Sequence, residues 1–353
     1  MMLSGWAGYP IVNASVSAPR GFEDLRLKVL EGEVIARGNG RAYGDSAINK
    51  QNTVHMKHLN RILDFDEVNG QLVAEAGVIL GDINLAVTQR GFFPFVTPGT
   101  KFVTLGGMIA ADVHGKNHHI DGSFGNFVEW IDILVEDGSI QHCSRIRNPD
   151  LFNWTIGGMG LTGIIIRAAI RLRPIKSVWI KQETLVAKNL SHAIDLMENS
   201  THCTYSVAWI DCLKKGNSLG RGLVMLGEHA ELSALPSVLR NTPFEFPYKS
   251  RLALPFNLPN FLMNRYTVRI FNHFYYELGK RKPRIQLIDL NSYFYPLDSI
   301  LGWNKIYGRN GFLQYQCVLP LQCAEKGLNE LINKIADAGS GSFLAVLKRF
   351  GSP

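Results

Sequence analysis

Imidazole, carboxylate and amine side chains gather in one short segment, Asp112–His119, which reads D-V-H-G-K-N-H-H. These groups can ligate a metal, move protons or stabilise an anion. The spacing of His114 and His118 would suit a metal on one helical face, but Gly115 and Asn117 disfavour a regular helix and H-E-x-x-H is absent. We therefore expect no metal here. Histidines that only pack or cap a loop remain the alternative to a chemical role.

Glycine-rich segments are the second signal. The loop Arg37–Asp45, R-G-N-G-R-A-Y-G-D, follows a strand-like run. Glycine lets consecutive backbone N–H groups approach a ligand and form an anion-binding nest, here for a pyrophosphate. This loop is not the G-x-G-x-x-G of a dinucleotide fold, and taken alone it is better explained as a structural turn.

Two further glycine clusters change that balance. One runs from Pro98-Gly99-Thr100 through Thr104-Leu105-Gly106-Gly107, and the other covers 157–165, G-G-M-G-L-T-G-I-I. Three such segments could together line an extended groove for a dinucleotide.

Other chemistries are disfavoured. There is no G-x-S-x-G nucleophile elbow. The cysteines, which form no C-x-x-C pair, indicate reduced thiols: Cys143, Cys203, Cys212, Cys317 and Cys323. No leader or apolar membrane span is evident, so we expect a cytoplasmic location.

The charge balance is basic, with 37 Lys and Arg against 30 Asp and Glu. Much of the excess lies among aromatics between 265 and 284. It could meet a phosphate-bearing substrate, an anionic membrane surface or nucleic acid, or it could be a solvated face. No RNP-like aromatic motif or helix-turn-helix signature supports nucleic acid.

The elements expected in the first half are short strands, hairpins and helices. Strands are predicted at 34–38, 53–59 and 163–174, and hairpins turn at Asn69-Gly70 and Asp137-Gly138. Helices are predicted from Leu80 to Gln89, ending at Gly91, and at 149–155. This is an α+β pattern.

The second half predicts an antiparallel sheet covered on one face by helices at 191–199 and 324–339. Strands are expected at 177–186, 206–212, 219–226, 286–295, 312–320 and 342–350. The stretch 241–284 fits neither element and is expected to be a lid or surface loop. We expect two domains, 1–175 and 176–353.

At these motifs the chain resembles the FAD-linked oxidoreductases of the vanillyl-alcohol oxidase type, closest to the decaprenylphosphoryl-β-D-ribose 2-oxidase branch. The shared order is R-G-x-G-R-x-Y-G-D, P-G-T-x-x-x-T-x-G-G, D-x-H-G-K-N-H-H, G-S-F-G-N and G-L-T-G-I-I. Downstream, S-x-A-W-x-D at 206–211, F-Y-P-L-D at 294–298 and G-F-L-Q-Y-Q at 311–316 continue it.

The resemblance implies a two-subdomain, PCMH-type FAD-binding domain followed by a substrate domain. The implied FAD contacts are Gly38, Asn39, Gly40, Arg41, Ala42, Tyr43, Gly99, Thr100, Thr104, Gly106, Gly107, Asp112, Val113, His114, Asn117, Gly163 and Ile165. Some members attach FAD covalently through a histidine in the first loop. Arg41 stands at that place, which implies non-covalent FAD.

The resemblance also implies a chemistry, with Lys116, His114 and Tyr43 as catalytic residues. Its substrate contacts would be Trp209, Tyr295, Gln314, Gln316 and Lys348. A secondary alcohol of a sugar would be oxidised, in the closest branch the 2-position of a polyprenyl-phosphate-linked ribose, with a short-chain reductase as partner and peripheral membrane contact.

Relatives continue beyond the position of Pro353 with a segment that completes the flavin domain and adds a lysine, so the resemblance implies a shortened chain. An aldonolactone or polyol oxidase, or a flavin-binding protein without turnover, stays open.

Overall fold

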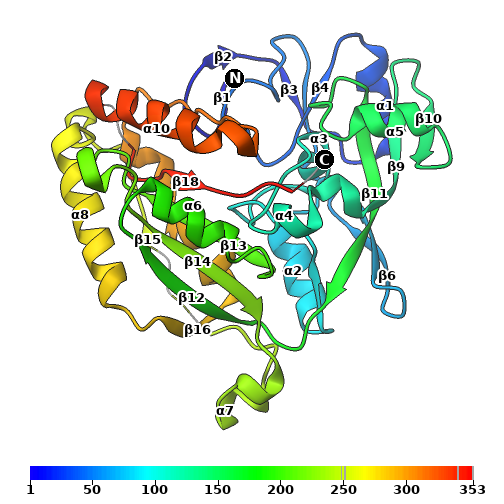
Figure 1. The fold of residues 1–353 in the computed structure, drawn as a ribbon. Helices are drawn as coiled ribbons and strands as arrows, with labels where there is room; N and C mark the ends of the chain where they lie inside the picture. The colour runs from blue at the N-terminus through cyan, green and yellow to red at the C-terminus, as the bar shows by residue number, and fades with distance from the viewer. Residues whose placement is uncertain (248, 250–251, 340–341, 352–353) are drawn as a thin grey trace.

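The computed structural model describes residues 1–247, 249, 252–339 and 342–351. In Figure 1 the first half of the chain forms the right and upper part of the molecule, and the second half forms the left and lower part around a second sheet. The α+β expectation is confirmed.

The first half is organised by a six-stranded antiparallel sheet in the order β10-β9-β11-β7-β6, with β8 also paired to β11. Its strands are β6 (Ile62–Asp66), β7 (Gln71–Glu75), β8 (Phe92–Pro94), β9 (Val128–Leu134), β10 (Ile140–Ser144) and β11 (Ile164–Pro174). The core side chains pack against helices α2 (Leu80–Thr88), α3 (Leu105–Ala110) and α5 (Pro149–Thr155). Both predicted hairpins are confirmed, since Gly70 and Gly138 adopt positive φ at the turns.

A smaller parallel sheet, β3-β5-β4, lies beside it. It comprises β3 (Val16–Ser17), β4 (Ile35–Arg37) and β5 (Thr53–His55), and α1 (Phe22–Leu30) packs Leu25 and Val29 against it. A two-stranded sheet, β1 (Met2–Ser4) with β2 (Ile11–Asn13), precedes it. The first glycine loop begins directly after β4.

The second half is built on a five-stranded antiparallel sheet, β16-β12-β14-β13-β18. The strands are β12 (Trp179–Ala187), β13 (Tyr205–Ile210), β14 (Gly222–His229), β16 (Ile285–Asp289) and β18 (Val346–Leu347). Because β11 ends at Pro174 and β12 begins at Trp179, we propose that the two domains divide at 175/176.

Helices cover both faces of this sheet. On one face, α6 (Leu190–Glu198) and α10 (Leu321–Ala338) pack over Ala208 and Val224. On the other, α8 (Arg265–Arg281) lies against Trp209 and Leu223. The expectation of a loop over 241–284 is wrong for α8, which begins at an Asn264–Thr267 capping box.

Three strand predictions are also corrected. Of 286–295, only β16 is a strand, and α9 (Leu290–Phe294) follows it. Residues 312–320 carry no regular element, and of the described part of 342–350 only β18 is a strand. Further short elements are α4 (His118–Asp121), α7 (Ser237–Arg240), β15 (Leu252–Ala253) and β17 (Ile300–Leu301).

None of the helices in the described part of the chain combines the length and apolarity needed to cross a bilayer.

Candidate active site

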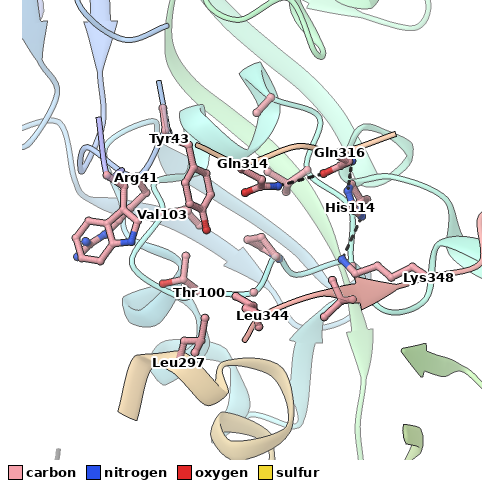
Figure 2. Close-up of a pocket in the computed structure, with 18 of the residues that line it drawn as sticks. Arg41, Tyr43, Thr100, Val103, His114, Leu297, Gln314, Gln316, Leu344 and Lys348 are labelled. Carbon is pink, nitrogen blue, oxygen red and sulfur yellow. Dashed lines mark hydrogen bonds between the residues drawn. The ribbon is translucent and has the colours of Figure 1, made fainter. Parts of the chain in front are cut away.

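A cavity of about 1890 Å³ lies where the two halves meet. The glycine loops line it together with segments 296–303, 312–321 and 344–351. Ligand pockets for one drug-sized molecule are typically about 300–1,000 Å³, so this cavity has room for more than one such ligand. Figure 2 shows side chains from both halves around it.

Glycine is required where the first loop meets the start of α3. A Cβ at Gly38 would lie 2.3 Å from Thr104 Oγ1, and one at Gly106 would lie 2.8 Å from Ala76 Cβ. Thr104 is held there because its hydroxyl caps α3, accepting from the Gly107 N–H at 3.3 Å. The sequence thus brings two glycine segments together as a cradle without side chains.

Arg41 adds a cation to this cradle. Its guanidinium lies 3.8 Å from the ring centroid of Trp6, and burial lowers its pKa. Its Nε is buried and has no hydrogen-bond partner among the described residues. A side-chain-free cradle beside a buried donor fits an anionic dinucleotide such as FAD.

Most of the expected cofactor contacts line the cavity. They are Gly38, Asn39, Gly40, Arg41, Ala42, Tyr43, Gly99, Thr100, Thr104, Gly106, Gly107, Val113, His114, Gly163 and Ile165. Two others serve the loop framework instead. Asp112 has a positive backbone φ, and its carboxylate accepts a hydrogen bond from the Gly125 N–H at 2.8 Å. The side-chain amide of the buried Asn117 donates to the Phe95 carbonyl at 2.7 Å.

His114 stands at the centre of a polar cluster (Figure 2). Lys348 Nζ lies 3.3 Å from its Nδ1, and the Gln316 side-chain amide lies 3.2 Å from its Nε2. The Gln314 amide reaches Gln316 at 3.4 Å. Burial, then the positive charge of Lys348, lower the pKa of His114 to about 4, so the imidazole is neutral at pH 7.

The neutral imidazole orders this cluster, because it carries a single N–H. If the Lys348 ammonium donates to Nδ1, Nε2 bears the proton and must face the amide oxygen of Gln316. A half-turn of the Gln316 amide, which exchanges its oxygen and nitrogen, satisfies this, and the Gln314 amide must turn with it so that its oxygen accepts from the Gln316 nitrogen.

Lys116 lines the same cavity from the loop before α4. Its ammonium donates to the Tyr293 carbonyl and lies 4.1 Å from the ring centroid of Tyr293. Burial, then the charge of Lys348, lower its pKa to about 7. Such an amine exchanges protons readily near neutral pH.

Of the remaining predicted site residues, one lines the cavity and two do not. Tyr43 lines the cavity and packs edge-on against Phe312, with ring centroids 5.5 Å apart. Trp209 and Tyr295 are not among the cavity-lining residues in the described part of the chain. Trp209 lies under α8, 4.7 Å from the Tyr275 ring, and the buried Tyr295 hydroxyl accepts from Asn84 at 2.9 Å. Their assignment as substrate contacts stays a prediction that this arrangement does not favour.

The structure also adds lining residues that the sequence did not indicate. Asp298 accepts from the Thr100 hydroxyl at 2.7 Å and from the Lys101 N–H at 2.8 Å, which links the second glycine segment to the second half. Phe350 stacks on His118 at 3.9 Å. No sequence motif includes Trp6, so no sequence signal indicated it. Asp298 is the last residue of the F-Y-P-L-D motif, which could have indicated it.

The histidines after His114 are engaged within the protein. His119 Nε2 lies 2.8 Å from the Cys203 carbonyl oxygen, and His118 Nδ1 accepts from the Gly351 N–H at 3.2 Å. Across the described ranges, no group of three or more His, Cys, Asp or Glu side chains is arranged to hold a metal.

Comparisons with known proteins identify the family and the cofactor. A family described as an FAD binding domain matches residues 29–144. Decaprenylphosphoryl-β-D-ribose oxidase of Mycolicibacterium smegmatis is 39% identical over 323 residues, which cover 90% of this chain and 70% of that protein. An uncharacterised Streptomyces coelicolor protein is 31% identical over 75% of this chain and 73% of its own length. Mouse L-gulonolactone oxidase is 27% identical over 39% of this chain and 31% of its own length.

Identity at this level over most of both chains, together with a glycine cradle suited to a dinucleotide, shows the family and the cofactor. The chain is an FAD-dependent oxidoreductase acting on CH–OH groups, and it belongs to the family of FAD-linked oxidases that includes decaprenylphosphoryl-β-D-ribose oxidase.

Proposed function

We propose that this chain oxidises the 2-hydroxyl of a ribose carried on a polyprenyl phosphate, giving the 2-keto sugar. The observation that carries the proposal is the convergence of His114, Lys116 and Lys348 on a cavity that the glycine cradle also lines. The similarity to a decaprenylphosphoryl-ribose oxidase supports the choice of sugar.

The FAD is held non-covalently in this proposal. The resemblance implies a histidine at the place of Arg41 in members with covalent FAD, and a guanidinium forms no such bond. Gly38–Tyr43, Thr104 and Gly106–Gly107 would hold the cofactor, together with Gly163 and Ile165, which line the same cavity. When bound, FAD supplies the two-electron oxidation of the alcohol carbon.

Lys116 takes the hydroxyl proton. A general base works best when its pKa lies near the working pH, and the pKa of Lys116 is about 7. The ammonium formed in this way also neutralises negative charge that develops nearby, which joins two functions in one side chain.

The other polar residues orient the sugar. Gln314 and Gln316 offer amide donors and acceptors to its hydroxyls, the Tyr43 hydroxyl adds another, and Lys348 fixes the neutral His114.

Two partners follow from this reaction. A 2-keto sugar must be reduced from the opposite face to invert that carbon, so we propose a nicotinamide-dependent short-chain reductase as the consumer, which would make the arabinose epimer. A polyprenyl carrier resides in lipid, so we propose peripheral contact with a membrane.

The test is anaerobic reduction of the purified, FAD-loaded chain by farnesylphosphoryl-β-D-ribose. We expect the visible flavin absorbance to bleach and one equivalent of keto sugar to form. L-gulono-1,4-lactone and simple polyols serve as competing substrates. Bleaching by those compounds alone would overturn the choice of sugar. A chain that dithionite reduces but no alcohol reduces would overturn turnover itself.

A further inference from the structure

The outward face of α8 carries large apolar side chains where a surface helix usually carries charge. Tyr266, Ile270, Phe274 and Leu278 recur every four residues, and each is 58–60% exposed. Residues four apart lie on one side of a helix, so these four form a continuous stripe, which we call the α8 stripe. Such a patch on a folded domain marks an interaction surface.

The orientation of the α8 stripe is set by the opposite side of the helix. Val268, Asn272 and Tyr276 are buried against the sheet. The Asn272 amide donates to Asp211 at 3.0 Å, and Arg221 pairs with the same carboxylate at 3.1 Å. A buried polar pair of this kind tolerates little rotation of α8, so the stripe must face away from the sheet.

Basic side chains border the α8 stripe. Between 265 and 284 there are six Lys or Arg and one acidic residue, Glu277. Arg269, Lys280 and Arg281 have no ion-pair partner among the described residues. Phe261, 74% exposed, adds another ring at the N-terminal end of the helix.

We propose that the α8 stripe and its basic border bind an anionic lipid bilayer, with α8 lying in the plane of the membrane surface. An apolar helical face with Lys and Arg beside it matches interfacial helices, whose rings enter the acyl boundary while the cations meet lipid phosphates. A protein partner is favoured less, because charged residues are depleted at the centres of protein interfaces, whereas 265–284 carries six Lys or Arg.

The position of α8 gives this contact a role. Phe271 of α8 contacts Phe343 at 5.5 Å between ring centroids, and Phe343 contacts Tyr307, a cavity-lining residue, at 5.7 Å. Two aromatic side chains therefore separate α8 from the cavity. Figure 1 shows α8 on the outer edge of the second half. The role assigned to this membrane contact rests on the proposed function, because the contact would bring a lipid-carried sugar to the site.

The experiment is flotation of the full chain with phosphatidylcholine vesicles that do or do not contain phosphatidylglycerol. We expect binding to the anionic vesicles that falls steeply with added salt. The double variant Ile270→Glu, Phe274→Glu should lose it. The matched control Val68→Glu, Ile146→Glu adds the same charge at exposed apolar positions far from α8 in the sequence and should keep it.

A charge variant tests the basic border separately. Arg269→Gln, Lys280→Gln, Arg281→Gln should weaken binding at low salt by roughly a hundredfold, since each cation near an anionic surface contributes about 1 kcal/mol. Circular dichroism and bound FAD confirm that each variant is folded.

Several results would overturn the inference. The wild-type chain could fail to float with anionic vesicles, or the stripe variant could float as well as wild type. The third such result is a control variant that loses as much vesicle binding as the stripe variant. Self-association without vesicles that the stripe variant abolishes would instead assign the face to a second copy.

The substrate assignment fails in a different way. If the chain floats with vesicles but oxidises no prenylphosphoryl sugar, the lipid surface stands and the proposed function falls. If it oxidises the short-chain substrate but never floats, only the lipid surface falls.

Discussion

Lys348 Nζ lies 3.3 Å from Nδ1 of His114, although 234 residues separate the two in sequence. The contact joins the loop before α4 to the segment after β18, and so connects the two halves across the cavity. A cation so close to an imidazole disfavours its protonation, and this is the second cause, after burial, of the low pKa of His114.

Replacing that lysine should change the titration of the histidine. In Lys348→Met, burial remains but the charge is gone, so we expect the pKa of His114 to rise from about 4 while staying below its ordinary value of 6.5. Histidine ring signals followed by NMR against pH measure this, with His114→Gln identifying the resonance. An unchanged titration would show that the two side chains do not interact in solution.

The role of Lys116 as a proton acceptor predicts a rising pH profile. The amine must be neutral to accept a proton, so the rate of flavin reduction should increase with pH through about 7 and then level off. Because bound FAD is anionic and favours the ammonium, the midpoint should lie at or above 7. Rapid-mixing reduction rates from pH 5 to 9 check the direction.

Two substitutions separate a base from a fixed charge at this position. Lys116→Met should slow reduction roughly 10²–10⁴-fold, the usual contribution of a general base. Lys116→Arg keeps the positive charge but cannot deprotonate, so it should be slowed as severely. An arginine variant near wild-type activity would leave Lys116 only an electrostatic role.

The glycine cradle predicts a specific loss of FAD affinity. In Gly38→Ala the new methyl meets Thr104 Oγ1 at 2.3 Å, so the loop must move from α3. Overpacking of this kind costs about 1–3 kcal/mol, or roughly 5- to 150-fold in affinity. Fluorescence titration of the apoprotein with FAD measures it. Gly21→Ala, whose Cβ meets nothing within 4 Å, should bind FAD normally.

Non-covalent attachment has a direct check. After acid precipitation of the purified chain, we expect all of the flavin in the supernatant, because Arg41 forms no bond to it. Flavin that stays with the pellet through washing would contradict that expectation and would require another attachment residue.

The buried Asp211–Arg221 pair should stabilise the second half. Both side chains are at least 90% buried, and removing one partner of such a pair leaves the other charge buried without its partner. Asp211→Ala should therefore lower the free energy of unfolding by about 3–5 kcal/mol. Urea denaturation followed by circular dichroism provides the measurement, and Asp64→Ala, an exposed carboxylate on β6, should change it little.

Local sequence was sufficient where local geometry decides the structure. The turns at Gly70 and Gly138 and the end of α2 before Gly91 all use positive φ, which glycine adopts without strain, so their positions could be predicted. The order of the glycine segments and the D-V-H-G-K-N-H-H motif likewise pointed to a flavin site, because the glycine segments and Val113–Lys116 contact the cavity from short, contiguous stretches.

Long-range packing decided the rest. Residues 312–320 alternate as a strand does but pair with no described strand, and α8 was missed because its aromatic, basic sequence lacks a polar outer face. Trp209 and Tyr295 belong to matching motifs, yet neither is among the described residues that line the cavity. Trp209 lies on the face of β13 that α8 covers, and the Tyr295 hydroxyl accepts a hydrogen bond from Asn84. The sequence by itself determined the cofactor class and its glycine cradle. Only the tertiary structure brought Lys348 to His114, since that meeting depends on how two separately built sheets pack.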